Sequence, residues 1–295
     1  MKKFGKALLA VAAALVLCAV VLGLLNGLIA KGSWTFGWLD YRYDQTGFET
    51  GGASVTSPNA DQLKRIEIDW IDGSVQVIPC KDICVSMTES AQGELGDGNE
   101  LTWKLSEDGT TLTVRYRKSS WFFQGTHKEN KTLTLRVPER FFGQLEELDV
   151  NVHSSRVTVT GLTLSTVRFS ADRGSLTGQD CQISKLIAKS QSGDVTWDGS
   201  VTDGAEVQAS GGKVSLSSAV CPKALDVKTQ SGDVTLSLPS DASFTMQWIT
   251  KKGSLTSDLS LATVEDGYRY GEGTAAFRVE TGKGDLLIKQ YAPRS

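Results

Sequence analysis

The sequence has few of the residues on which metal sites and most cofactor sites depend. Its 295 residues include only two histidines, His127 and His153, and five cysteines. None of these residues has the spacing of a zinc site, and a calcium-binding nonapeptide repeat rich in glycine and aspartate is also lacking. We therefore expect neither a structural metal nor a bound cofactor.

Basic runs and prolines are also scarce. The net charge is −3, and no stretch concentrates lysine and arginine, so nucleic acid is not an expected partner. Only six prolines stand beside 30 glycines, and serine, threonine and valine are abundant. Such a composition favours short strands joined by tight turns. A hydrophobic content of 40% is ordinary for a protein that folds.

A catalytic constellation is missing as well. Cleavage of a carbohydrate needs two carboxylates that converge across one groove, whereas Asp172, Asp198 and Asp203 are scattered and each suits a turn. A Ser/His/Asp arrangement is not convincing either, because His153 stands among serines. We expect a protein that is not an enzyme, with a carbohydrate-active enzyme as the weakest of the readings considered.

The N-terminus predicts a membrane anchor. Three lysines precede an uncharged stretch, residues 7–30, which is long enough to cross a bilayer as a helix. The basic flank places residues 1–6 in the cytoplasm and the bulk of the chain outside it, in a single-pass protein of the cell membrane. A cleaved signal peptide remains the alternative, although an Ala-x-Ala cleavage site does not stand out.

Residues 31–60 predict an aromatic juxtamembrane segment and a spacer. Tryptophan and tyrosine, common at the start of this segment, favour the headgroup level of a membrane. Beyond it, Cys80 and Cys84 are close enough for a disulfide or for two free thiols, and the sequence leaves both open. Cys181 and Cys221 are 40 residues apart, which places them too far from each other to bond in a regular stack.

A repeated phrase organises residues 61–290. It reads Ser-Gly-Asp-Val-Thr at residues 192–196 and 231–235, with looser copies elsewhere. The apolar residue after each turn recurs at steps of 19 to 21 residues, at Val157, Leu176, Val195, Val214, Val234 and Leu255. A second apolar pair follows each marker, ending with Phe244 and Met246. This period predicts an all-β fold, a parallel β-solenoid of stacked coils, with residues 259–273 as an insertion and the last stretch as a cap.

The repeated phrase is expected to form the corners of the coils. Glycine would supply a positive φ there, and aspartate would bond the local backbone, so a structural role outweighs a ladder of cation sites. The predicted corner residues are Gly174, Gly193, Asp194, Gly212, Gly232, Asp233 and Gly253.

The order of these features resembles a bacterial cell-envelope strand-repeat family. An opening strand pair is followed by Gly-Thr-Thr-Leu-Thr-Val at residues 109–114, by Leu-Thr-Leu-Arg-Val-Pro at residues 133–138, and then by the repeated phrase. The resemblance covers residues 63–289. Family members are named adhesins on the basis of architecture and are also classed as a domain of unknown function, so the resemblance implies an exported β-solenoid but no set of catalytic residues.

Two interruptions of the pattern are candidate partner contacts. Trp121, Phe122 and Phe123 lie together in a polar loop, and Tyr268 and Tyr270 lie in the insertion. Exposed apolar groups of this kind mark contacts with partners, although the first three residues suit a cap on the core equally well. The leading hypothesis is a membrane-anchored binding or scaffold module that attaches to an envelope protein or glycan. The rival is an accessory or sensor domain in envelope-stress signalling.

Overall fold

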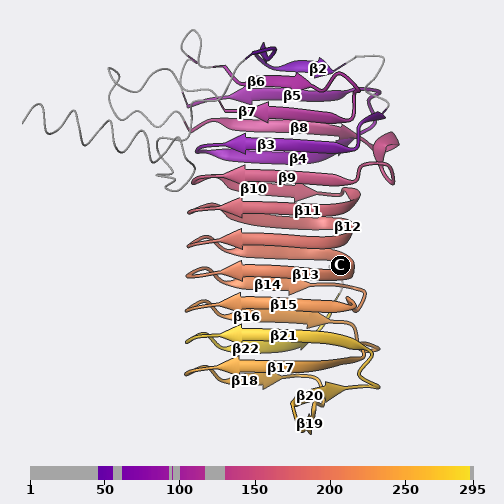
Figure 1. Cartoon of the computed structure of the whole chain (residues 1–295), viewed down its shortest axis with the longest axis vertical. Helices are drawn as coiled ribbons and strands as arrows, with labels where there is room; N and C mark the ends of the chain where they lie inside the picture. Colours follow the sequence, from indigo (N-terminus) through magenta and orange to yellow (C-terminus); the bar gives the residue numbers. More distant parts are fainter. Residues whose placement is uncertain (1–45, 56–61, 93–94, 96–99, 117–129, 293–295) are drawn as a thin grey trace, which may run out of the picture. The chain divides into compact units, whose positions relative to one another are not determined.

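The computed structural model describes residues 46–55, 62–92, 95, 100–116 and 130–292 (Figure 1). The predicted membrane segment, the juxtamembrane aromatics and Trp121–Phe123 lie outside the described residues. Within the described part, none of the helices is long and apolar enough to span a membrane. The chain divides into the units Met1–Thr46 and Gly47–Ser295, and the second is the subject below.

The all-β prediction is confirmed. The described residues form 22 strands and include the short 3-10 helix Glu139–Phe141. The strands are β1 (Glu49–Thr50), β2 (Ala53–Val55), β3 (Arg65–Trp70), β4 (Ser74–Cys80), β5 (Val85–Ser90), β6 (Thr102–Leu105), β7 (Thr111–Arg115), β8 (Thr132–Pro138), β9 (Glu147–Val152), β10 (Arg156–Thr160), β11 (Thr163–Ala171), β12 (Ser175–Ser190), β13 (Val195–Ala209), β14 (Val214–Ser217), β15 (Ala224–Thr229), β16 (Val234–Leu238), β17 (Phe244–Thr250), β18 (Leu255–Ser257), β19 (Ala262–Val264), β20 (Gly267–Tyr270), β21 (Ala275–Thr281) and β22 (Leu286–Gln290).

Most strands belong to two parallel rows. Row one runs β7–β3–β9–β11–β12–β13–β15–β21–β17, and row two runs β8–β4–β10–β12–β13–β14–β16–β22–β18. The long strands β12 and β13 contribute their first halves to row two and their second halves to row one. One strand from each row, with the corner between them, makes what we call a coil, and coils lie on one another along the vertical axis of Figure 1.

The apolar markers line up in columns. Val157 lies opposite Leu176, Leu176 opposite Val195, Val195 opposite Val214, and Val214 opposite Val234. These side chains have at most 1% of their surface exposed. Since inward and outward residues alternate along each strand, the same register keeps a continuous apolar core on one side of each row and polar residues on the other.

The order of the last coils differs from the prediction. Leu255 does not follow Val234, because Leu286 of β22 lies between them and pairs with both. The coil β21–β22 is therefore inserted between β15–β16 and β17–β18. The prediction that the last stretch of the chain caps the stack is wrong, since β17–β18 ends the parallel rows and the hairpin β19–β20 follows. The insertion of residues 259–273 supplies this hairpin.

The last apolar pair is also shifted. Met246 lies opposite Phe277, and Trp248 lies opposite Val279, in the columns that contain Leu225 and Val227. The sequence predicted Phe244 and Met246 for these columns, whereas Met246 and Trp248, each two residues later in the chain, occupy them. Counting a fixed distance from Val234 fails because the chain adds residues in the connection between β16 and β17.

Corner glycines are required by close approach rather than by positive φ, which corrects the expected cause. A Cβ atom at Gly193 would lie 1.8 Å from the carbonyl oxygen of Gly174, and one at Gly212 would lie 2.1 Å from that of Gly193. Positive φ does occur at the corner of the first coil, where Gly73 has φ +87°. Stacking brings corner backbones so close together that a side chain has no room.

The corner aspartates bond across coils rather than within their own turn. Asp194 Oδ1 accepts a hydrogen bond of 2.8 Å from the backbone N–H of Lys213. Asp233 Oδ1 accepts one of 3.1 Å from the backbone N–H of Asp285. Where the aspartate is present, at Asp194 and Asp233, it therefore ties its own corner to the next, which makes it a structural residue.

The other end of the stack is closed by antiparallel strands and contains a buried ion pair. β6 pairs with β7, and β5 pairs with β8. Lys131 Nζ lies 3.0 Å from Glu89 Oε1, with side-chain exposures of 0% and 3%. Glu89 Oε2 also accepts a hydrogen bond of 2.7 Å from the backbone N–H of Leu101. The Lys131 ammonium stacks 4.4 Å from the ring of Tyr116.

The four described cysteines are free thiols. Cys181 is buried, and burial raises the pKa of its thiol above the ordinary value; burial also raises the pKa of the Cys80 and Cys221 thiols. A raised pKa keeps a thiol protonated and lowers its reactivity at neutral pH.

Candidate functional site

The end of the stack formed by β17–β18 is where the regular pattern stops. Hairpin β19–β20 pairs with β17 only along Phe244–Met246, in the antiparallel sense. Glycines shape this segment: Gly267, with φ +141°, begins β20 at the hairpin turn, while Gly271 and Gly273, with φ +63° and +78°, follow the strand. Conformations of this kind favour glycine, which explains why it occurs at the turn and after β20.

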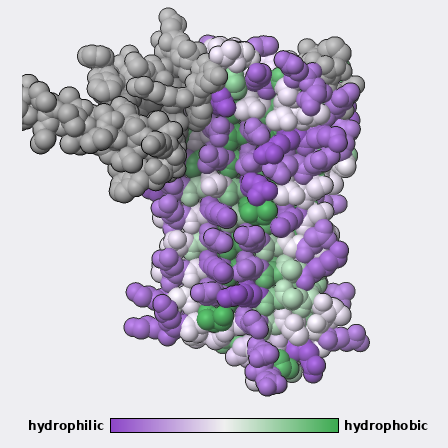
Figure 2. Space-filling model, viewed as in Figure 1, coloured by the Kyte–Doolittle hydropathy of each residue, from purple (hydrophilic) through white to green (hydrophobic). Residues whose placement is uncertain are grey.

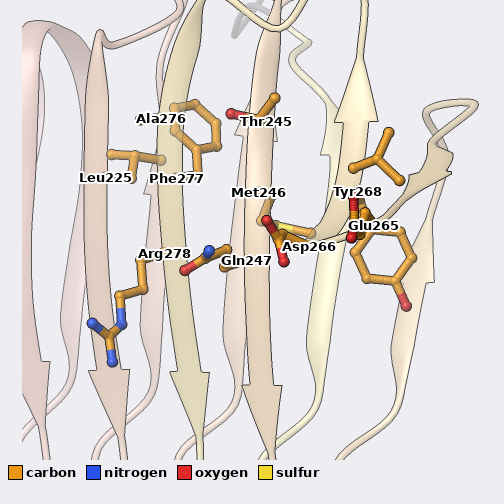
Figure 3. Close-up of a pocket in the computed structure, with 11 residues that line it drawn as sticks. Leu225, Thr245, Met246, Gln247, Glu265, Asp266, Tyr268, Ala276, Phe277 and Arg278 are labelled. Atoms are coloured by element: carbon orange, nitrogen blue, oxygen red, sulfur yellow. The ribbon is translucent and has the colours of Figure 1, made fainter.

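A groove lies between this hairpin and the outer side of row one. It has a volume of about 550 Å³ and is lined by Leu225, Thr245, Met246, Gln247, Val264, Glu265, Asp266, Tyr268, Ala276, Phe277 and Arg278. Figure 3 shows that these residues come from β15, β21 and β17 on one side and from the hairpin on the other. Thr245, Gln247, Ala276 and Arg278 face outward in it, whereas Leu225, Met246 and Phe277 are at most 5% exposed and lie in the core beneath them. Polar groups placed around a concave surface can orient a ligand.

The groove contains charges of both signs. Arg278 Nη2 lies 3.6 Å from Glu280 Oε2, and both side chains are nearly half exposed. Such a surface pair contributes about 0–1 kcal/mol, so Arg278 can exchange Glu280 for a ligand carboxylate at little cost. Exposed Glu265 and Asp266 at the tip of the hairpin offer acceptors on the opposite side. The arrangement suits a ligand that carries separated polar groups.

The two predicted tyrosines occupy different environments. Tyr268 lines the groove. The Tyr270 hydroxyl donates a hydrogen bond of 2.9 Å to the carbonyl oxygen of Ser240, and its ring packs 5.8 Å from that of Phe244. Tyr268 thus lies where a partner can reach it, whereas Tyr270 fastens the hairpin to the stack.

Gln247 and Arg278 are groove residues that the sequence alone did not indicate. Both lie at outward positions of ordinary strands, where polar residues are expected whatever their role. Only the break in the repeat period near residue 259 could have directed attention to this end of the molecule.

The carboxylates considered for glycoside cleavage do not share a groove. Asp172 Oδ2 lies 2.8 Å from His153 Nδ1, and Asp203 Oδ1 lies 2.7 Å from Lys223 Nζ. Asp198 lies within β13, opposite Gln179 and Ser217. Each carboxylate is thus placed in a different part of its coil. The described residues include no cluster of three or more histidine, cysteine or acidic side chains suited to a metal ion.

The pair of His153 and Asp172 was missed by sequence reasoning, although their spacing of 19 residues places them at equivalent corners. Arg173 Nη2 lies 3.0 Å from His153 Nε2. A guanidinium only donates, so Nε2 accepts, and Nδ1 donates its proton to Asp172. A general base of the Ser-His-Asp type needs Nε2 to face a hydroxyl group. Arg173 occupies that position, and the cluster ties one corner to the next.

Arginines and carboxylates also form a network on the outer side of row one. Arg65 lies 2.9 Å from Glu67, 3.2 Å from Glu147 and 3.1 Å from Asp149. Burial raises the pKa of Asp149 above its ordinary value, while the Arg65 charge opposes this shift. The contacts link β3 to β9, which are neighbours in the stack but not in sequence, so the network has a structural role.

Comparison with known proteins identifies the family. The family model described as Toastrack DUF4097 matches residues 63–224, more than half of the chain. The chain belongs to the Toastrack DUF4097 family. This Toastrack match ends where β15 begins, so nearly all of the groove lies beyond it. The family match thus covers the stack as far as β14, and the groove must be interpreted from its own geometry.

Two solved structures are similar to this Toastrack chain over 82% of its length. A "putative cell adhesion protein" from Clostridium sporogenes has 10% identity and a TM-score of 0.41, with 97% of that chain covered. A "putative adhesin" from Bacteroides fragilis has 15% identity and a TM-score of 0.45, with 96% of that chain covered. A search of curated proteins gave no significant match.

Proposed function

We propose that this protein is a non-enzymatic binding or scaffold module of the cell envelope, of the adhesin type. Residues 7–30 anchor it in the membrane, and residues 61–290 form an extracytoplasmic β-solenoid with coils of 19 to 21 residues. Its partner is an envelope protein or glycan.

The observation that carries this proposal is the groove beneath hairpin β19–β20. The stack itself is regular, and the face of it seen in Figure 2 is mostly hydrophilic, with scattered hydrophobic side chains. The hairpin interrupts this regularity and adds Tyr268 and two acidic residues to a pocket in which Gln247 and Arg278 of the stack face outward. Binding sites are commonly placed on projections that a rigid scaffold supports.

Site-specific photo-crosslinking on intact cells tests the proposal. A photoreactive amino acid at position 268 should give a discrete cross-linked product, because this position faces the groove. The control is position 220, where Val220 is 45% exposed and lies outside the groove. Equal products at both positions, or none at either, would contradict a specific contact in the groove.

Cell adherence and membrane topology provide the second test. A deletion strain should adhere poorly, and full-length protein should restore adherence, whereas the Arg278→Ala variant should restore it only in part. External protease should digest residues 61–290 in cells whose membrane is intact. Normal adherence together with altered expression of envelope-stress genes would replace adhesion with an accessory role in signalling.

A further inference from the structure

The ladder of hydrogen bonds between corners stops at the last coil. In each earlier coil of the regular array, the backbone N–H of the apolar marker donates to a corner carbonyl of the next coil. The pairs are Leu176 to Asp194, Val195 to Lys213, Val214 to Asp233, Val234 to Asp285 and Leu286 to Ser254, at 2.8–3.0 Å. Within the described residues, the N–H of Leu255 has no next coil to which it can donate.

The edge of β17 is open beyond the hairpin. Lys251 donates to Gly282, and Ser243 accepts from Ala275, so the odd-numbered residues of β17 direct their backbone groups toward β21. Even-numbered residues direct theirs outward. The hairpin pairs with Phe244 and Met246, but among the described residues no strand pairs on that side with Trp248 or Thr250. An unpaired edge of this kind is a template for an added strand.

The core beside this edge is incompletely covered. Trp248 and Leu255 are only half-buried, whereas Val279 and Leu286 at the equivalent positions of the neighbouring coil are 0% exposed. Ile249, on the outer side, is 46% exposed. A further strand would therefore bury apolar surface as well as satisfy the backbone.

Two lysines directly follow the open edge, and a third lies in the neighbouring corner. A second groove, of about 440 Å³, contains Lys251, Lys252 and Lys283 together with Ile249 and Glu280. Lys251 and Gly282 occupy equivalent corner positions. The three corners before them carry the neutral residues Gln191, Ser210 and Gln230 at this position, and the corner before those carries Asp172. Glu280 already pairs with Arg278, and within the described residues none of the three lysines has an acidic partner within 4 Å. The groove is therefore basic.

This charge identifies the occupant. A second copy of the chain that joined edge to edge would bring its own Lys251 and Lys252 against these lysines, and lysines on an edge are a known device against such pairing. We propose that the open edge at Gln247–Thr250 binds an extended, acidic segment of a partner polypeptide by strand addition. The proposal rests on the proposed binding function and names the chemistry of the partner.

The geometry also determines where the acidic side chains of the bound segment lie. Its backbone pairs with Trp248 and Thr250, and its acidic side chains lie over the lysine groove. The hairpin tip lies at the other end of the open edge, because Gly267 is the next residue in register after the pair of Tyr268 with Met246. Glu265 and Asp266 directly precede Gly267, so they repel acidic groups at that end. The acidic residues should therefore lie toward the corner end of β17.

A peptide of alternating valine and glutamate is the probe. Full-length protein should bind it, and hydrogen exchange should show new protection at Trp248 and Thr250. The Lys251→Glu/Lys252→Glu variant should bind about tenfold more weakly or worse, which corresponds to about 1.4 kcal/mol. The matched control is Lys185→Glu/Lys189→Glu, which makes the same charge change at exposed outward positions of β12 and should bind normally.

Peptide variants separate strand addition from simple charge attraction. The same peptide with alternate backbone nitrogens methylated retains its charges but loses its donors, so it should bind at least about tenfold more weakly. Equal binding of the methylated peptide, an absence of binding by the unmodified one, or a concentration-dependent dimer that blocks the edge would each overturn the proposal. If the peptide fails while the cross-link at position 268 persists, the proposed binding function stands and only the strand addition is lost.

Discussion

At the scale of single residues, the corner glycines separate two reasons for glycine in a turn. Gly212 and Gly211 are adjacent, but a Cβ at Gly212 would lie 2.1 Å from a backbone oxygen, whereas one at Gly211 would lie 3.6 Å from its nearest neighbour. Gly212→Ala should lower the free energy of unfolding by about 1–3 kcal/mol or more. Gly211→Ala, the control, should change it by less than about 1 kcal/mol. Urea denaturation measures both, and equal losses would contradict the close-approach explanation.

Asp285 gives a prediction that depends on pH. The backbone N–H and hydroxyl of Ser254 donate to its carboxylate at 2.7 and 2.8 Å, and these bonds lower the pKa of Asp285 below 3.8. Stability from the ionised form is therefore present above pH 3.8 and is lost as the pH falls through the lowered folded-state pKa. Asp285→Ala should lower Tm at pH 7, with a difference from wild type that shrinks at acidic pH.

The control for Asp285 is Glu272→Ala, which removes an exposed acid near the hairpin. Its Tm should follow that of the wild type at every pH. If the Tm of the Asp285→Ala variant lies equally far below that of the wild type at pH 7 and at pH 3, the carboxylate charge does not stabilise the corner.

The buried pair of Lys131 and Glu89 predicts a rescue. Glu89→Gln keeps an acceptor for the Leu101 N–H but removes the carboxylate charge 3.0 Å from the buried Lys131 ammonium, which should cost about 3–5 kcal/mol. Adding Lys131→Met removes the buried positive charge and should restore most of this stability. Chemical denaturation of the two single variants and the double variant completes a cycle. A double variant no more stable than Glu89→Gln alone would contradict the argument.

Which residues form the corners was easier to predict than the contacts that require glycine and aspartate there. Glycine and aspartate at the corners are evident from the repeat, and the sequence also supports a structural role for them. The approach of Gly193 to Gly174 and the bond from Lys213 to Asp194 connect successive coils, so they depend on stacking geometry. For the same reason the ion pair of Lys131 with Glu89 cannot be seen in the sequence pattern, because the two residues are 42 positions apart, with Glu89 in β5 and Lys131 just before β8.

At the scale of elements, hairpin β19–β20 should respond differently to changes at its two tyrosines. Tyr270→Ala removes the hydrogen bond to Ser240 and the contact with Phe244, so stability should fall by about 1–3 kcal/mol. Amides of Phe244–Met246 should then exchange faster. Tyr268→Ala should leave hydrogen exchange at Phe244–Met246 nearly unchanged, but it should weaken the binding of the partner that cross-links at position 268. Faster exchange in the Tyr268 variant alone would reverse the two roles.

The repeat period predicted which residues form strands better than it predicted which strands pair with each other. The strands containing Val195 and Val214 follow directly from the repeat, and they are adjacent both in sequence and in the stack. Pairing of β16 with β22 could not be predicted, because Leu255 and Leu286 both fit the marker position and a pattern of inward apolar residues does not say which coil comes next. The candidate groove depends on this order, since β21 and β17 must be neighbours to form its floor.

At the scale of the whole described unit, both ends of the stack use the same arrangement. β3–β4, the first coil in sequence, lies between β7–β8 and β9–β10, and β21–β22, the last, lies between β15–β16 and β17–β18. Each of these coils therefore has a neighbour on both sides instead of a free edge. Because a stacked coil contacts only its neighbours, a coil held on two sides is harder to detach than one at the end of the array.

Truncation tests this arrangement. A chain that ends at Thr274 keeps β17–β20 but lacks the coil on which β17–β18 rests, so Phe244, Met246 and Leu255 lose their neighbours in β21 and β22. A chain that ends at Ser240 stops just beyond β16 and keeps every earlier coil stacked as before. We expect β17 and β18 to lose hydrogen-exchange protection in the first truncation, while β12 and β13 stay protected in both. Retained protection of β17 in the chain ending at Thr274 would mean that it stacks directly on β15–β16, as the spacing of Val234 and Leu255 first suggested, and that the inserted coil is not required.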